Sequence, residues 1–333
     1  MPRRTVSLRG EPLLNIASYA RRGPGRRDRL SPGEIDQIAR TARRTPEVMI
    51  KVLSRGGQDL RAVRRHLDYL RDRDEGELAI ETDDGERLTG PGVAKNLTED
   101  WNLDLHEHRQ RSDLDGRGRH STKRVHKLMF SMPAGTPPQK VLEAVKNFAR
   151  EEFALNHRYA MVLHTDEPHP HVHMVVRAVS EQGARLHIRK ATLRGWRREF
   201  ARHLRVLGVP ANATDRAVRG ASRSPKLDGI YRAERRGESW RTQARAQEVG
   251  REILRGRFRN EPGKVTLIET RKAIERGWWE VSDILAAQGH GDLAKEVKQF
   301  VGGMPPPRTD REMIAEGLRR HHRESQAREG PIR

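Results

Sequence analysis

The chain has no cysteine among its 333 residues, which excludes disulfide bonds, thiolate zinc sites and cysteine nucleophiles. No apolar run approaches the roughly 18 residues that a membrane span requires. The N-terminal MPRRTVSLRG is charged but lacks the apolar segment that follows in a signal peptide. No GxxxxGK[ST] motif occurs, which excludes a P-loop helicase module. These absences predict a soluble, cytoplasmic protein without a membrane span.

Acidic residues are scarce relative to basic ones. The chain has 66 Lys and Arg against 46 Asp and Glu, and a net charge of +20. Hydrophobic residues make up only 34%, enough for one modest core rather than 333 compact residues. Such an excess of positive charge causes self-repulsion, so it favours a polyanionic partner, above all nucleic acid. A solvated basic surface is the alternative.

Composition divides the chain into three parts. Residues 1–46 are a basic N-terminal extension that contains RRGPGRR. Residues 47–220 alternate predicted strands and helices. After the SRSPKLDG linker, residues 221–333 are Arg-rich, mainly helical and interrupted by GGMPPP. We therefore expect one central domain with an extension on each side.

Hydrophobic patterning locates the elements of the central domain. An apolar stripe at helical spacing (Leu60, Val63, Leu67 and Leu70) predicts a helix that Asp59 caps and that runs to about Arg73. Asp84-Gly85 predicts a hairpin turn within 77–90. The sequence also predicts strands at 48–53, 125–132, 159–164 and 171–176, and helices from Pro137-Pro138 and over 193–207.

Four histidines gather in HTDEPHPHVHMVV (164–176). Side chains two residues apart in a strand share a face, with Cα atoms about 6.5–7 Å apart, so His171 and His173 can reach one ion. His164 ends the preceding strand and can supply a third ligand across the hairpin. Three imidazoles with open positions suit catalytic Mn²⁺ or Mg²⁺, or Zn²⁺. Asp166 is close enough to orient a histidine, whereas His169 is as readily an ordinary surface histidine.

A metal site alone does not name a reaction, so a nucleophile would decide it. The chain has only four tyrosines. Tyr69 lies on the 59–73 helix, turned roughly 130° from the centre of its apolar stripe. Since it does not point into the predicted packing face, Tyr69 is a candidate nucleophile for a neighbouring site.

Three segments, in this order, resemble the conjugative relaxases, the mobilisation nucleases of the HUH endonuclease superfamily. The closest likeness is to the P class, which includes the T-DNA border endonuclease of Ti plasmids. RRHLDYLRDRDEG (64–76) is similar to the tyrosine motif, the segment 127–153 to the Ser–hydrophobic–Pro–Ala–Gly motif, and HTDEPHPHVHMVV to the histidine motif. The resemblance covers about residues 47–220. Tyr69 lies further from the N-terminus than in this family, which makes the N-terminal extension a departure.

The resemblance implies an α/β (α+β) fold, an antiparallel central sheet of about five strands with packed helices. It implies that Tyr69 attacks a phosphodiester of single-stranded DNA at an origin of transfer and stays joined to the 5′ phosphate. A divalent ion, Mg²⁺ or Mn²⁺ with Zn²⁺ as the alternative, is held by His164, His171 and His173, with His169 in place of His164 as a further possibility. The proton acceptor is left open between Asp166, His164 and the metal.

The same resemblance implies DNA contacts and partners. Ser131 contacts DNA near the cleaved bond, and Arg64, Arg65, Arg71 and Arg73 suit phosphate contacts, although a solvated helix face is their alternative. The implied partners are accessory relaxosome proteins and a type IV secretion coupling protein, with export to a recipient cell. Two alternatives stay open: a rolling-circle replication initiator or transposase of the same superfamily, and a non-catalytic basic DNA-binding accessory protein.

Overall fold

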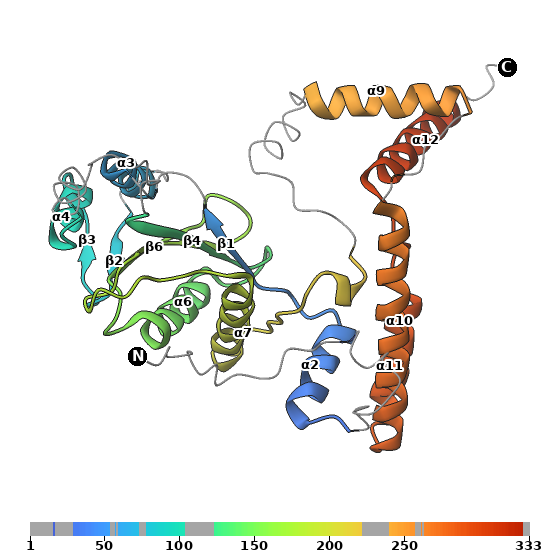
Figure 1. The fold of residues 1–333 in the computed structure, drawn as a ribbon, viewed down its shortest axis with the longest axis horizontal. Coiled ribbons are helices and arrows are strands. Elements are labelled where there is room, and N and C mark those ends of the chain that lie inside the picture. Colours follow the sequence, from blue (N-terminus) through green and yellow to red (C-terminus); the bar gives the residue numbers. More distant parts are fainter. Residues whose placement is uncertain are drawn as a thin grey trace, which may run out of the picture. The chain divides into compact units, whose positions relative to one another are not determined.

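The computed structural model describes residues 16, 29–53, 57, 59–72, 78–103, 123–221, 240–256, 261 and 263–328. These residues form two compact units (Figure 1). The first unit contains the described residues of 44–213. The second contains Ile16, residues 29–43 and the described residues from 214 onward. The segment 29–43, which we expected in an N-terminal extension, thus belongs with the C-terminal helices.

The first unit is built on a six-stranded antiparallel sheet with the strand order β1-β4-β6-β5-β2-β3. This confirms the predicted α+β class, with one strand more than the five expected. The predicted hairpin around Asp84-Gly85 forms the edge pair β2 and β3. The strands are β1 (Met49–Leu53), β2 (Ile80–Thr82), β3 (Arg87–Leu88), β4 (Val125–Ser131), β5 (Tyr159–His164) and β6 (His171–Arg177).

One face of the sheet packs on helices α6 (Pro138–Phe153) and α7 (Lys190–Val206), below the sheet in Figure 1. Aromatic side chains fill this layer, and Phe148 contacts both Phe130 on β4 and Trp196 on α7. Aromatic side chains bury large apolar areas, so we regard this layer as the principal core of the unit.

The other face, here called the histidine face, is covered by α3 (Leu60–Arg71) and α4 (Val93–Asp100). Asp59 caps α3 by accepting hydrogen bonds from the amides of Arg61 and Ala62, and the predicted stripe of α3 is buried. The stripe packs on Val125, Val162 and Val175 of the sheet. Helix α4 was not predicted, because its eight residues offer little more than two helical turns of pattern.

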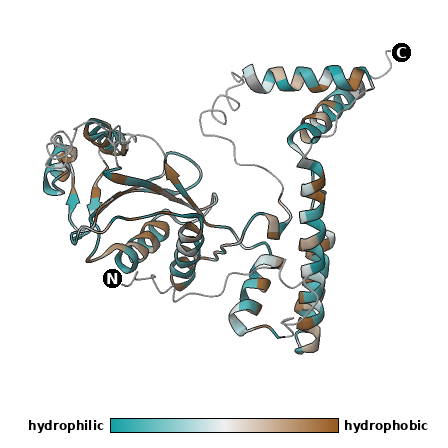
Figure 2. Cartoon of the chain, in the orientation of Figure 1, coloured by the Kyte–Doolittle hydropathy of each residue, from teal (hydrophilic) through white to brown (hydrophobic). Residues whose placement is uncertain are grey.

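The second unit is helical where it is described. Its elements are α2 (Pro32–Ala42), η1 (Ala217–Arg219), α9 (Trp240–Leu254), α10 (Gly263–Ala287), α11 (Gly291–Gly302) and α12 (Asp310–Arg328). Ser31 and Glu34 form the capping box of α2. Trp278 of α10 is fully buried and donates its indole N–H to the Val218 carbonyl, whereas Trp279 is 44% exposed. Hydrophobic and hydrophilic residues alternate along these helices (Figure 2). This pattern is typical of amphipathic helices that pack through one face.

None of the helices that the structure describes is long and apolar enough to cross a membrane. The SRSPKLDG linker, which begins at Ser222, lies outside the described residues, and so does most of the polar segment 102–123.

Gly57 sets the position of the chain between β1 and α3. Its carbonyl accepts hydrogen bonds from the amides of Arg124 at 2.6 Å and Val125 at 3.2 Å. A Cβ added at Gly57 would lie 2.5 Å from the Val125 carbonyl oxygen. The Gly57→Ala variant must therefore push this segment off β4. We expect a loss of about 1–3 kcal/mol in the free energy of unfolding, measured by urea denaturation.

The matched control is Gly291→Ala. Gly291 is the first residue of α11, and a Cβ there meets no atom within 4 Å. Alanine is the better helix former, so this variant should be at least as stable as the parent protein. Equal urea midpoints for the Gly57→Ala variant and the parent protein would contradict the close approach.

Candidate functional site

Three histidines converge on the histidine face where β5 ends and β6 begins. His164 pairs directly with His171 across the two strands, and His173 follows on the same face. Their ring centroids are 5.3 Å (164–171), 4.9 Å (164–173) and 5.2 Å (171–173) apart. One ligand atom from each ring lies within 4.8 Å of the other two, and all three residues are buried. The strand register thus produces the predicted triangle.

Backbone carbonyls determine which nitrogen of two rings carries the hydrogen. His164 Nε2 lies 2.9 Å from the Leu70 carbonyl, and His171 Nδ1 lies 3.0 Å from the His169 carbonyl. A carbonyl oxygen only accepts, so each of these nitrogens donates. The lone pairs of His164 and His171 are therefore on Nδ1 and Nε2, respectively. Metal-ligating histidines usually have their second nitrogen held in this way, and three buried imidazoles that offer nitrogen lone pairs suit a divalent ion.

The bond from His164 reaches the helix that carries the tyrosine. Leu70 is in the last turn of α3, where carbonyls lack intrahelical partners. Tyr69 immediately precedes it and is 49% exposed, whereas Leu67 and Leu70 are buried. This confirms that Tyr69 is turned out of the packing face. The structure therefore places the backbone of the tyrosine turn beside the histidines and leaves the tyrosine side chain accessible.

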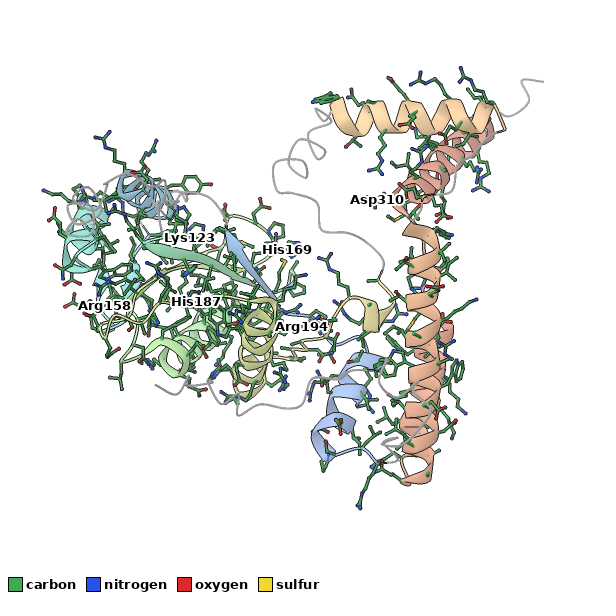
Figure 3. The ribbon with its side chains drawn as sticks, viewed as in Figure 1. Lys123, Arg158, His169, His187, Arg194 and Asp310 are labelled. Carbon is green, nitrogen blue, oxygen red and sulfur yellow. The ribbon has the colours of Figure 1, made fainter. Side chains whose placement is uncertain are left out.

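Asp166 and His169 lie on the loop between β5 and β6 (Figure 3 labels His169). The Asp166 Oδ1 atom is 3.9 Å from Nε2 of His171, the nitrogen with the lone pair. The other nitrogen of the His171 ring is held by the His169 carbonyl, so this backbone group, rather than the predicted Asp166, orients the ring. The side chain of His169 is exposed, and the histidine triangle found among the described residues contains His164 instead.

Ser131 lies directly opposite His171 on the neighbouring strand β4 and is buried, which brings the Ser–hydrophobic–Pro–Ala–Gly segment to the same site. The arginines around Tyr69 differ in their surroundings. Arg64 donates to Thr98 Oγ1 at 2.8 Å, and Arg71 donates to the Gly90 carbonyl at 2.7 Å. Arg65 is exposed to solvent. Arg73 lies outside the described residues.

Two further polar residues of the site were missed from the sequence. His66, one turn before Tyr69, stands edge-on to His173 with ring centroids 6.2 Å apart. Burial, together with the charge of Lys127 and the proximity of His164, lowers the pKa of His66 to about 4. Burial also lowers the pKa of Lys127, on β4, to about 8. Two features of the sequence could have pointed to these residues. His66 is a histidine beside the apolar stripe of α3, and Lys127 is a lysine inside an apolar strand.

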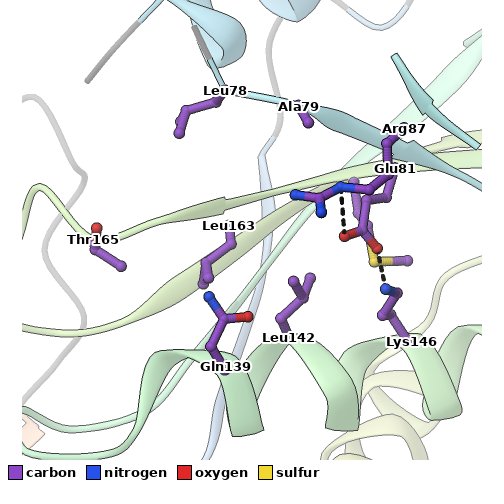
Figure 4. A pocket seen from close by; sticks show the side chains of 10 residues that line it. Leu78, Ala79, Glu81, Arg87, Gln139, Leu142, Lys146, Leu163 and Thr165 are labelled. Carbon is purple, nitrogen blue, oxygen red and sulfur yellow. Dashed lines mark ion pairs between the residues drawn. The ribbon is translucent and has the colours of Figure 1, made fainter. Parts of the chain in front are cut away.

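A separate pocket of about 470 Å³ lies on the opposite side of the sheet, between β2, β5 and α6 (Figure 4). Leu142 and Leu163 line it on one side. At the other side the buried Glu81 forms ion pairs with Lys146 and, at 3.7 Å, with Arg87. The carboxylate is thus neutralised within the protein. Neither Tyr69 nor any of the three histidines lines this pocket, so we do not assign it to the site.

Two comparisons relate part of the chain to known proteins. Residues 80–206 match the family described as Relaxase: MobA/VirD2-like, nuclease domain. The chain is 26% identical over 190 residues to the T-DNA border endonuclease VirD2 of Rhizobium radiobacter, which covers 54% of this chain and 44% of that protein. No solved structure matches the chain significantly. The family match includes the three histidines and begins after Tyr69. These matches relate residues 80–206, which contain the three histidines, to the nuclease domain of MobA/VirD2-like relaxases.

Proposed function

We propose that this protein nicks one strand of DNA at a plasmid origin of transfer by transesterification and pilots the bound strand in conjugation. The observation that carries the proposal is the hydrogen bond between His164 and the Leu70 carbonyl, because it joins the histidine triangle to the turn that bears Tyr69. The name of the VirD2 relative, a T-DNA border endonuclease, supports a strand-nicking role.

In the proposed step, the Tyr69 hydroxyl oxygen forms a bond to the scissile phosphorus, and the bond from phosphorus to the 3′ oxygen breaks. The 5′ phosphate stays on the tyrosine, and the departing 3′ oxygen takes up a proton. A tyrosine hydroxyl has an ordinary pKa of about 10, so a base must accept its proton. We assign this to Asp166, whose carboxylate lies beside the histidines and whose side chain is 22% exposed, so it can pass the proton to water.

His164, His171 and His173 would hold a divalent ion, Mg²⁺ or Mn²⁺ with Zn²⁺ as the alternative. When bound, such an ion supplies positive charge against the non-bridging oxygens of the scissile phosphate. The protein contributes the fixed orientation of the rings, so no reorganisation is needed when charge develops in the transition state.

The proposal extends to DNA contacts and partners. Ser131, beside His171, is suited to a contact near the cleaved bond, and Arg65 is exposed for a phosphate contact. Arg64 donates a hydrogen bond to Thr98 of α4, and Arg71 donates one to the Gly90 carbonyl. Only the remaining N–H groups of these two arginines can contact DNA. Arg73 remains in the proposed set on its sequence position alone. Accessory relaxosome proteins and a type IV secretion coupling protein are the partners that this function requires.

Tyr69→Phe should abolish covalent capture of DNA. The assay incubates the protein with Mn²⁺ and labelled single-stranded plasmid-origin oligonucleotides and resolves protein-linked 5′ products on denaturing gels. We expect a loss of at least about a thousandfold, because no other group then forms the phosphoester. Tyr159→Phe is the matched control and should capture DNA like the parent protein. Tyr159 is buried in the core between the sheet and helices α6 and α7, and this change keeps its aromatic ring.

Cleavage that persists without Tyr69 but needs His171 would instead indicate a hydroxide-using nuclease. Binding of every oligonucleotide without any cleavage by the parent protein would favour the accessory-protein alternative. Cleavage at a replication origin in preference to transfer origins would favour a rolling-circle initiator.

Removing one imidazole should weaken metal binding. We expect His173→Ala to bind Mn²⁺ on the order of 100-fold more weakly in isothermal titration calorimetry, since one of three nitrogen ligands is lost. His187→Ala, which changes an exposed histidine of the same unit, should bind Mn²⁺ like the parent protein. If both variants match the parent protein, the triangle is not the metal site.

A further inference from the structure

Part of the histidine face extends beyond the triangle toward the edge of the sheet. The register places Met49, Ser131, His171 and His164 in one row across β1, β4, β6 and β5. The next row contains Lys51, Met129 and His173. Side chains directly opposite one another in antiparallel strands share a face, so both methionines and Lys51 lie on the side of the histidines.

These side chains are not used in the core. Met49 is 37% exposed, Lys51 is exposed, and Met129 is only half-buried although β4 lies between two other strands. By contrast, Ile50 and Phe130, which point to the opposite face, are buried in its core. The described part of the chain offers no ion-pair partner for Lys51. The two methionines and the lysine thus form an open shelf. Its inner end, Met129, lies one strand or about 5 Å from His173, and Met49 and Lys51 lie two strands or about 10 Å from the histidines.

We propose that this shelf, Met49, Met129 and Lys51, positions the nucleotide next to the scissile phosphate. The inference rests on the proposed function. Thioethers are polarisable and make favourable contacts with aromatic rings, which suits a base or a sugar without reading its sequence. Lys51 supplies the positive charge that a neighbouring phosphate needs. A strand that leaves the histidines along these rows meets both kinds of contact, whereas an apolar protein partner would leave Lys51 buried and unpaired.

Methionine oxidation locates the contact without requiring cleavage. The Tyr69→Phe protein is treated with hydrogen peroxide, with and without saturating single-stranded oligothymidylate, and sulfoxide formation is measured at each methionine by mass spectrometry. We expect DNA to protect Met49 and Met129. Met304 and Met313, which are partly buried in the second unit, should oxidise equally in both samples.

Affinity and its salt dependence separate the two contributions. Met49→Ala combined with Met129→Ala should weaken oligothymidylate binding about tenfold, as two thioether–base contacts are lost. Met49→Leu combined with Met129→Leu should recover most of this loss. Lys51→Gln should reduce the slope of log K against log salt by about 0.7, the value for one phosphate of a single strand. The control Lys140→Gln changes an exposed lysine of α6, which covers the opposite face of the sheet, and should leave the slope unchanged.

Equal oxidation of Met49 and Met129 in both samples, or unchanged affinity and slope in the variants, would overturn the shelf even if the parent protein nicks DNA. Conversely, protection of these methionines in a protein that never nicks would support the shelf and refute the proposed reaction. The two ideas therefore fail in different assays.

Discussion

The site depends on one hydrogen bond, from Nε2 of His164 to the carbonyl of Leu70, across 94 residues of sequence. The bond gives a partner to a carbonyl in the last turn of α3, and a buried carbonyl left without a hydrogen bond typically costs about 1–3 kcal/mol. It also selects the tautomer of His164. A single contact thus secures the end of α3, aims a ring nitrogen at the triangle and keeps the tyrosine turn over the strands that carry the other histidines.

The sheet can hold so many buried polar groups on one face because its opposite face is packed with apolar side chains. The face toward α6 and α7 is packed with aromatic side chains, and its large apolar area stabilises the unit. The histidine face carries buried His164, His171, His173 and Lys127, each of which costs desolvation. The low pKa of Lys127 reflects that cost directly. Burial on the apolar face thereby offsets the desolvation cost of the buried polar groups on the histidine face.

The local features of the site were predictable, and the long-range ones were not. The apolar stripe of α3 placed Tyr69 outside the packing face, and alternation in β6 placed His171 and His173 on one side. The position of β1 beside β4, and with it the alignment of Met49 and Lys51 with the histidines, depends on pairing between distant strands. Periodicity contains no information about such pairing. His66 and Lys127 were missed for the same reason, since their importance comes from what folds against them.

The order of the site's elements along the chain also affects the order in which they fold. β5 and β6 are neighbours in sequence and form a hairpin, which closes quickly because the intervening loop is short. All three imidazoles are on this hairpin, whereas Tyr69 arrives from a helix far earlier in the chain, whose contacts with the sheet are non-local and form slowly. During folding, we therefore expect the triangle to take shape before α3 and Tyr69 dock on the sheet. In the native state, the His164–Leu70 bond then joins these two independently formed parts of the chain.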